Sequence, residues 1–177
     1  MSSPKVVKDL MISIFDLPHI PYWFSVREAI KMIRVSFFET QKYPEPLPVL
    51  VFDEKFSLMG TLTLKDILEG LEPRFLKPST RSQLPEEDGS NLTLIWDTLF
   101  TEESKELANR PVNEVMVPAR VFVEPQTPIS KAAYLMLRHN LILLPVLEEK
   151  KKFVGLVRMV EIFHEISHTI VQEQEER

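Results

Sequence analysis

A threonine and an aspartate stand three residues apart where an apolar stretch gives way to a helical pattern. Thr63 and Asp66 directly follow the segment from Leu58 to Leu62. A hydroxyl at the N-cap of a helix and a carboxylate at its third position form a capping box, and the free N–H groups of the first turn attract anions. Two interpretations follow. Either the pair only caps a helix, or a phosphate binds at the helix end while Asp66 accepts hydrogen bonds from sugar hydroxyls.

A second group of residues has the spacing of a zinc site. His164-Glu165-Ile166-Ser167-His168 matches a motif in which two imidazoles one helical turn apart bind zinc and the glutamate activates water. A catalytic zinc needs a third protein ligand, yet the glutamates that follow lie in a charged tail. The helical spacing predicts a buried stripe on this helix, formed by Met159, Ile162, Phe163, Ile166 and Ile170, with both histidines on another face. We therefore expect no metal site, and zinc hydrolysis stays an alternative.

Composition and charge exclude several classes of protein. The 177 residues include 21 basic and 26 acidic side chains, a net charge of −5, which disfavours a nucleic-acid surface. No apolar run approaches the roughly 18 residues that a membrane crossing needs, and the first ten residues lack the apolar centre of a secretory signal. The chain has no cysteine and hence no disulfide or thiolate. We expect a folded cytoplasmic protein that needs no cofactor, with no nucleic acid or membrane as partner.

The first part of the chain alternates between strand and helix patterns. Ser25 and Glu28 have capping-box spacing, and apolar residues then recur at helical intervals as far as Phe37. Two predicted strands follow, over 47–52 and 58–62, and the helix that begins after Thr63 ends near Gly70. From 73 to 110 the composition becomes rich in proline and in polar residues, which predicts a surface insert with helical segments, one of them around Trp96.

The remaining residues repeat this order. Gly155 lies 155 − 60 = 95 positions after Gly60, and Leu144-Pro145-Val146 matches Leu47-Pro48-Val49. Each half reads strand, helix, strand, strand, helix, a unit that cannot cover its own sheet and must pair with a second one. We predict a first repeat over 1–72, the insert over 73–110, and a second repeat over 111–177.

These features together resemble the cystathionine-β-synthase (CBS) domain family. The resemblance rests on marks that occur in the same order in both halves, namely Val7-Lys8-Asp9-Leu10-Met11 and Val112-Asn113-Glu114-Val115-Met116, the helices around Ala29 and Ala132, the two Leu-Pro-Val segments and the two glycine strand ends. It implies a mixed α/β fold, a stand-alone pair of β-α-β-β-α repeats packed through their sheets about a pseudo-two-fold axis. In this family the clefts between repeats often bind adenosine-containing ligands, and two modules commonly form a dimer.

The resemblance also implies a site. The family signature Gly-x-x-Thr/Ser-x-x-Asp matches the residues from Gly60 to Asp66, which gives Thr63 the contact to phosphate and Asp66 the contact to ribose. Apolar contact with the base would come from around Pro48 and Val49, together with the side chain of Thr61 or Leu62.

The second repeat departs from the signature. Arg158 stands where Thr is expected and Glu161 where Asp is expected. Arg158 cannot cap a helix, but its guanidinium could donate to a phosphate. We expect one good site in the first repeat and a degenerate or empty one in the second.

The ligand class can also be narrowed by resemblance. Members of the family that hold di- or triphosphates often carry His or Arg just before the Leu-Pro-Val strand. Here those positions are Glu45 and Pro46, then Ile142 and Leu143. AMP, adenosine or another adenosyl compound is therefore favoured over ATP.

The resulting hypothesis is a non-catalytic regulatory module that senses an adenosyl ligand. We expect a homodimer whose output passes to another protein, with the insert as a candidate contact surface. The alternative is a structural protein with empty clefts whose role is dimerisation.

Overall fold

The computed structural model describes residues 5–40, 43, 45–72 and 102–175. The chain divides into two compact units: unit 1 consists of Met1–Leu17 and Ala119–Arg177, and unit 2 consists of Pro18–Pro118. The elements predicted within 73–101, including the helical segment around Trp96, lie outside the described residues. Among the helices that the structure describes, none has the length and apolar content that a membrane crossing requires.

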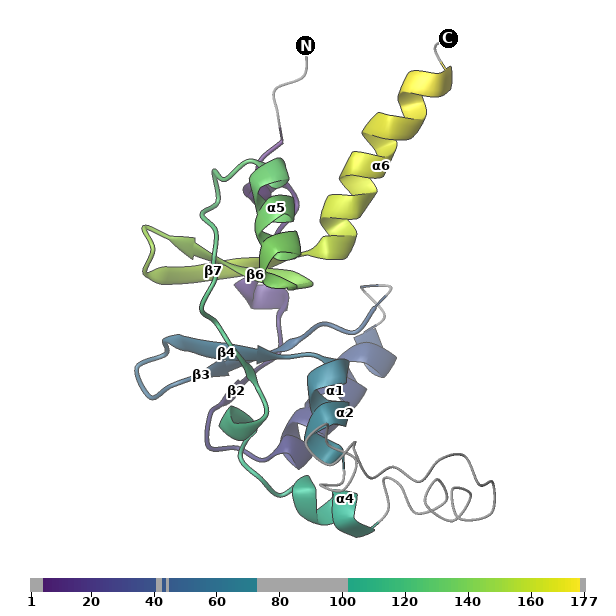
Figure 1. Cartoon of the computed structure of the whole chain (residues 1–177). Helices are drawn as coiled ribbons and strands as arrows, with labels where there is room; N and C mark the ends of the chain where they lie inside the picture. The colour runs from purple at the N-terminus through teal and green to yellow at the C-terminus, as the bar shows by residue number, and fades with distance from the viewer. Residues whose placement is uncertain (1–4, 41–42, 44, 73–101, 176–177) are drawn as a thin grey trace, which may run out of the picture. The chain divides into compact units, whose positions relative to one another are not determined.

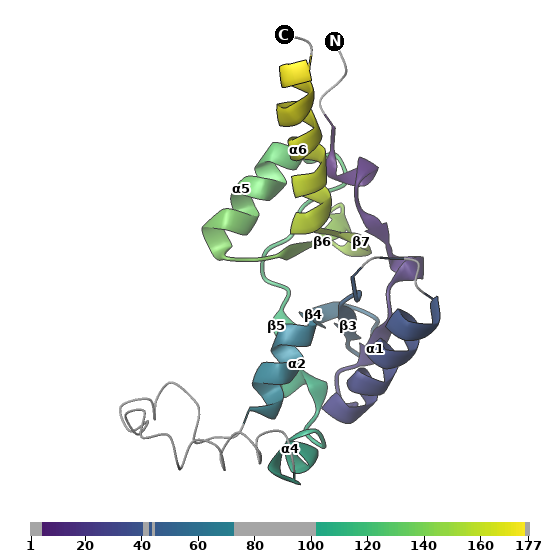
Figure 2. The ribbon, with the colours of Figure 1, turned by 90° about the vertical axis from the view of Figure 1, so that its right-hand side faces the viewer.

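Unit 2 is built on a four-stranded sheet in the order β2-β3-β4-β5 (Figure 1). Its strands are β2 (His19–Pro21), β3 (Val49–Phe52), β4 (Leu58–Leu62) and β5 (Val117–Pro118). β2 runs parallel to β3, and the other neighbours are antiparallel. Two helices, α1 (Val26–Thr40) and α2 (Leu64–Leu71), cover one face of this sheet (Figure 2). The chain reaches β5 through α4 (Glu102–Leu107) and the short 3-10 helix η5 (Val112–Glu114).

Unit 1 contains a three-stranded antiparallel sheet in the order β1-β7-β6. Its strands are β1 (Ile12–Ser13), β6 (Leu143–Glu148) and β7 (Lys152–Arg158), and its helices are η1 (Val7–Asp9), η2 (Ile14–Asp16), α5 (Ile129–His139) and α6 (Met159–Glu175). The extended piece that the sequence predicts around Val123 forms a single parallel bridge to Val146. Both repeats therefore follow the predicted order of strands and helices, with that bridge in place of one strand.

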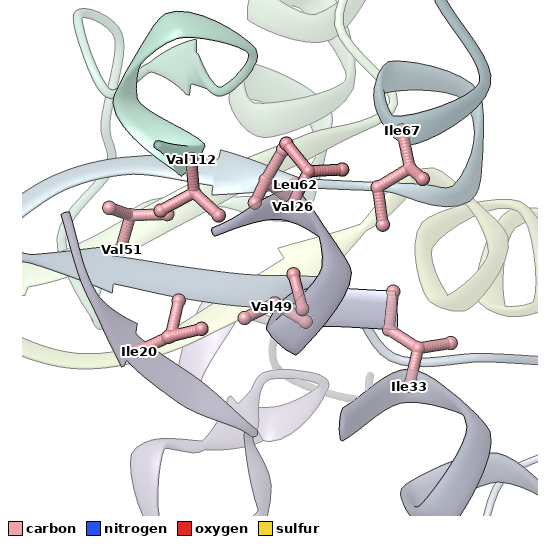
Figure 3. Close-up of a cluster of buried hydrophobic side chains, with 9 residues drawn as sticks. Ile20, Val26, Ile33, Val49, Val51, Leu62, Ile67 and Val112 are labelled. Atoms are coloured by element: carbon pink, nitrogen blue, oxygen red, sulfur yellow. The ribbon is translucent and has the colours of Figure 1, made fainter. Parts of the chain in front are cut away.

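The core of unit 2 forms where two sequence periods meet (Figure 3). Side chains two residues apart on a strand share one face, as Val49 and Val51 do on β3. Side chains seven apart on a helix also share a face, as Val26 and Ile33 do on α1. The buried cluster consists of Ile20, Val26, Ala29, Ile33, Val49, Val51, Leu62, Ile67 and Val112. A second cluster forms the core of unit 1 and consists of Val7, Val123, Ala132, Met136, Leu144, Val146, Val157 and Ile162.

The two antiparallel hairpins share one register, which fixes how the repeats correspond. In unit 2 Val51 lies opposite Gly60, and in unit 1 Val146 lies opposite Gly155. Both hairpins also carry an irregularity in register directly after that valine. The two glycines are therefore equivalent, as the sequence predicts.

This register corrects one part of the sequence match. The segment that corresponds to Leu144-Pro145-Val146 is Val49-Leu50-Val51, so the match to Leu47-Pro48-Val49 is wrong by two residues. The shared Leu-Pro pair is not structurally equivalent, because Pro48 precedes β3 whereas Pro145 lies inside β6. β6 is an edge strand of its sheet, where a residue without an N–H group is tolerated.

The compact units cut across the predicted repeat boundaries at 72/73 and 110/111. β1 lies near the start of the predicted first repeat, yet it pairs with β7 of the second repeat. β5 lies near the start of the predicted second repeat, yet it pairs with β4 of the first. Each repeat therefore has its sheet completed by the short strand that leads into the other repeat.

Glycine makes these two strand pairings possible. A Cβ atom on Gly60 would lie 2.6 Å from the carbonyl oxygen of Val117 in β5, and one on Gly155 would lie 2.3 Å from the carbonyl oxygen of Ile12 in β1. Neither oxygen can move without shifting its strand, because both belong to the backbone. A side chain at either position would therefore push away the strand that completes the sheet.

The predicted buried stripe of α6 is wrong for most of its length. Ile162 is buried, whereas Phe163, Ile166 and Ile170 are exposed. Helical spacing identifies residues that share a face, but it does not say whether the same chain covers that face. Within unit 1, the C-terminal turns of α6 extend past the end of α5 (Figures 1 and 2).

We predict that Gly155→Ala destabilises the protein by about 1–3 kcal/mol, because the new methyl group overlaps the backbone of β1. The measurement is urea unfolding followed by circular dichroism. Lys152→Ala, an exposed substitution on the same strand, is the control and should change little. Equal midpoints for the two variants would contradict the close approach of β1.

Candidate functional site

The junction between β4 and α2 brings the two residues of the predicted signature into direct contact. Thr63 is the N-cap of α2, and its Oγ1 accepts a hydrogen bond from the backbone N–H of Asp66 at 3.3 Å. In return, Oδ2 of Asp66 accepts from the backbone N–H and from the hydroxyl of Thr63, both at 2.7 Å. The predicted capping box is confirmed.

The cap occupies only one oxygen of the Asp66 carboxylate. Asp66 is buried, yet none of the described residues donates a hydrogen bond to its Oδ1. An ionised carboxylate has roughly four lone-pair positions, and the cap fills two of them on Oδ2. Asp66 can therefore hold the first turn of α2 and still accept hydrogen bonds from another molecule through Oδ1.

The neighbouring signature residues are placed by the sheet. Gly60 and Thr61 pair with β3 on one side and with β5 on the other. Thr61 is buried, and the side chain of Leu62 lies in the core of unit 2. The end of β4 is thus fixed on both edges, which sets the position of Thr63.

The residues predicted beside the base are also buried. Val49 lies opposite Leu62 and packs with it in the core of unit 2, and Pro48 directly precedes β3. Because Val49 and Leu62 direct their side chains to the core, a ligand at this edge of the sheet would meet the backbone of these residues. Thr61 is one position along from Leu62, so its side chain lies on the other face of β4.

The junction between β7 and α6 shares one backbone hydrogen bond with the β4–α2 junction and carries different side chains. The backbone N–H of Arg158 donates to Oε2 of Glu161 at 3.1 Å, just as Thr63 donates to Asp66. The guanidinium of Arg158 also binds this carboxylate: Nε donates to Oε1 at 3.0 Å and to Oε2 at 3.2 Å, and Nη2 donates to Oε1. Three donor groups of Arg158 therefore converge on Glu161, and the Nε–H is shared between the two oxygens.

The two junctions consequently differ in what they can accept. Asp66 keeps one oxygen without a donor among the described residues, whereas both oxygens of Glu161 accept from Arg158. A sugar hydroxyl at Glu161 would therefore compete with a charged guanidinium for either oxygen.

The histidine motif on α6 does not gather a metal site. The rings of His164 and His168 lie edge to face with centroids 4.6 Å apart, and Glu165 forms an ion pair with Lys5 at 2.6 Å. Across the described residues, no three His, Asp or Glu side chains come close enough together to hold a metal ion. Glu165, the residue that would activate water in a zinc enzyme, is thus paired with Lys5, which precedes η1.

Comparison with known proteins places this fold. The model of the CBS domain family matches residues 112–168, most of the second repeat. No curated protein matches the sequence. Solved structures match it over nearly its whole length. CBSX2, known from Arabidopsis thaliana and solved in complex with AMP, has a TM-score of 0.57 at 17% identity, with 97% of this chain and 98% of that chain covered.

Two further structures show the same fold. The CBS domain pair of MJ0100, in complex with 5′-methylthioadenosine and S-adenosylmethionine, gives a TM-score of 0.61 at 17% identity over 94% of this chain and 99% of that one. The cytosolic domain of the Mg²⁺ channel MgtE, in complex with ATP, gives 0.58 at 19% identity over 90% of this chain and 48% of that one. At these identities the likeness concerns the fold.

We predict that Thr63→Ala lowers the free energy of unfolding by about 0.5–2 kcal/mol, because α2 loses its N-cap. Thr63→Ser keeps the hydroxyl and should stay close to the unmodified protein. Both values come from urea unfolding. A serine variant as unstable as the alanine variant would show that the methyl group of Thr63, and not the cap, carries the effect.

Proposed function

We propose that the chain is a regulatory module that binds an adenosine-containing ligand at the β4–α2 junction. The premise is that residues 112–168 match the CBS domain family and that the chain has the fold of a CBS pair. The observation that carries the proposal is the asymmetric use of the Asp66 carboxylate, with Oδ2 in the cap and Oδ1 without a donor among the described residues. A carboxylate oxygen that keeps its lone pairs beside a helix N-terminus suits the hydroxyls and phosphate of a nucleoside monophosphate.

In this proposal each residue of the junction has a separate role. Oδ1 of Asp66 accepts from the ribose hydroxyls, and Thr63 with the first N–H groups of α2 binds the phosphate. Thr61 and the backbone near Pro48 and Val49 contact the base. Gly60 holds the end of β4 in place through its pairing with β5.

The ligand class follows from the charges near the strand. No His or Arg occurs between Glu45 and Pro48, or at Ile142 and Leu143, so these positions offer no cation to a β- or γ-phosphate. We therefore propose AMP, adenosine or another adenosyl compound in preference to ATP. The complexes of CBSX2 with AMP and of MJ0100 with two adenosyl compounds support this class, and that of MgtE with ATP shows that the fold also accepts a triphosphate.

The proposed role is regulation without catalysis, in the cytoplasm where adenosine nucleotides are made. The ligand would change the conformation of the module, and an effector protein would respond to that change. The insert over 73–110 remains our candidate for the effector contact.

We predict that one of AMP, adenosine and S-adenosylmethionine raises the melting temperature of the protein and that Asp66→Ala abolishes the rise. Ligand at 100 times its dissociation constant stabilises by about 2.7 kcal/mol, a shift of several degrees in a chain of this size. The measurement is thermal unfolding with and without each compound, with ATP alongside.

The control for this experiment is Glu69→Ala, which removes an exposed carboxylate from the same helix. Asp66→Ala also weakens the cap, so the relevant quantity is the ligand-dependent shift and not the starting melting temperature. If no compound shifts the unmodified protein, Thr63 and Asp66 serve only as a cap, and the structural module without ligand becomes the better description.

The exposed apolar face of α6 supports the second part of the proposal, association with another copy of the chain. Phe163 is 67% exposed and Ile170 is 62% exposed, and with Ile166 they lie on one face of the helix. A helix end that projects with apolar side chains in water is stabilised when another apolar surface covers it. We propose that this surface is α6 or α5 of a second copy.

We predict that the double variant Phe163→Glu, Ile170→Glu is monomeric where the unmodified protein is dimeric, because two buried charges oppose the association. Light scattering after gel filtration gives the mass. Thr169→Glu adds the same charge on an exposed position of α6 and should leave the dimer intact. A monomeric unmodified protein would overturn this part and favour an effector protein as the partner of α6.

A further inference from the structure

The ion pair between Arg158 and Glu161 is unusually buried for a pair only three residues apart. The side chain of Arg158 is 9% exposed and that of Glu161 is 22% exposed. Arg158 is the last residue of β7 and lies opposite Leu143 of β6, so its backbone is fixed by the sheet. A guanidinium in this position needs a counter-charge, because removing charge from water is costly unless it is paired.

Glu161 provides that counter-charge completely from within the chain. Its two oxygens receive the backbone N–H, Nε and Nη2 of Arg158, so both oxygens already hold donors. On the other side of the pair, no described residue accepts a hydrogen bond from Nη1 of Arg158. The guanidinium thus keeps a donor group for a further acceptor, and Glu161 is the anion that it now binds.

We infer that Glu161 acts as a tethered anion that occupies Arg158 and closes the β7–α6 junction to ligands, so that the chain binds its ligand at one junction only. The statement that one junction binds ligand rests on the proposed function of the β4–α2 junction. The closure of the β7–α6 junction by Glu161 does not depend on that function. Glu161 takes the place in which the phosphate of a ligand would meet the guanidinium and the start of α6. Arg158 and Glu161 of the second repeat then keep this junction closed, and they are not simply the remains of a lost binding site.

A variant that lacks the carboxylate of Glu161 should bind an anion from solution in its place. In Glu161→Gln the buried guanidinium loses its counter-ion, and the nearest equivalent from solution is an oxyanion with several acceptor oxygens. Guanidinium binds phosphate through paired hydrogen bonds, and the N-terminal end of a helix adds to the attraction. Inorganic phosphate should therefore stabilise this variant more than it stabilises the unmodified protein.

The test is thermal unfolding of the full chain as Glu161→Gln, as Arg158→Thr with Glu161→Asp, and without substitution. Each is measured in phosphate and in chloride at matched ionic strength. We expect Glu161→Gln to melt about 3–6 °C higher in phosphate once the anion is tenfold above its dissociation constant. The Thr-Asp double variant places the residues of the Thr63–Asp66 cap at this junction and removes the guanidinium, so it should respond less than Glu161→Gln.

Two results would overturn the inference. One is an equal response of the unmodified protein and Glu161→Gln to phosphate, since Glu161 would then block nothing. The other is a Glu161→Gln variant that gains nothing from phosphate. If this variant does not fold in chloride, recovery on refolding in phosphate supports the inference, and failure in both salts while the Thr-Asp variant folds refutes it. Adding Asp66→Ala to Glu161→Gln should leave the phosphate response unchanged, which separates this inference from the proposed function.

Discussion

A close backbone contact at the edge of each sheet is the constraint on which the rest of the structure depends. β5 lies against Gly60 and β1 against Gly155, at distances that leave no room for a Cβ atom. At each contact, a short strand that leads into one repeat pairs with the N–H and C=O groups along the edge strand of the other repeat. The two compact units are therefore made of interchanged pieces of the repeats, and neither repeat holds its complete sheet within its own sequence.

The same contact determines where the proposed site lies. Thr61 pairs with Leu50 on one side and with Val117 on the other, so the last residues of β4 are held from both edges. The chain leaves the sheet after Leu62, Thr63 is the N-cap, and α2 begins at Leu64. The cap between Thr63 and Asp66 therefore leaves a single residue between strand and helix. In unit 1 the exit from β7 is equally fixed, and the carboxylate three residues on again binds the first N–H. The same backbone hydrogen bond thus holds two different carboxylates: Asp66 keeps one oxygen without a donor among the described residues, and both oxygens of Glu161 accept from Arg158.

The sequence predicts those parts of this arrangement that depend on local chemistry. The capping box at Thr63 depends on residues three apart, and the equivalence of Gly60 and Gly155 on a repeated pattern of strands. Both are confirmed. Composition and periodicity do not report which strand pairs with which repeat, because that choice depends on contacts between residues more than a hundred positions apart, as for Ile12 and Leu156.

Three other features lie beyond sequence reasoning for different physical reasons. The shared Leu-Pro pair misleads, because a proline before β3 and a proline inside β6 read alike in sequence. The stripe on α6 has the right period, but a period does not name the surface that covers it, and Phe163 is exposed. The ion pair of Glu161 with Arg158 depends on Arg158 being partly enclosed at the end of β7, which the residue types alone do not report.

The contacts of α2 indicate which residues a ligand at Asp66 would affect. The C-terminal end of α2 is held by two side chains from the last residues of the insert: Nη2 of Arg110 donates to the carbonyl of Gly70 at 2.6 Å, and Oγ of Ser104 donates to that of Leu71 at 3.1 Å. These bonds satisfy carbonyl groups that the end of a helix leaves without partners.

The same helix also touches the chain that leads into unit 1. A Cβ atom on Gly70 would lie 2.5 Å from a methyl group of Val115, so α2 packs directly on the turn before β5. A ligand at the N-terminal end of α2 and the strand that completes the sheet at Gly60 therefore act on one connected piece, from Ser104 to Pro118. A shift of α2 would therefore first reach these contacts, all of which lie within unit 2. The tight packing at Gly60 and Gly70 leaves α2 little room to move unless this segment moves with it.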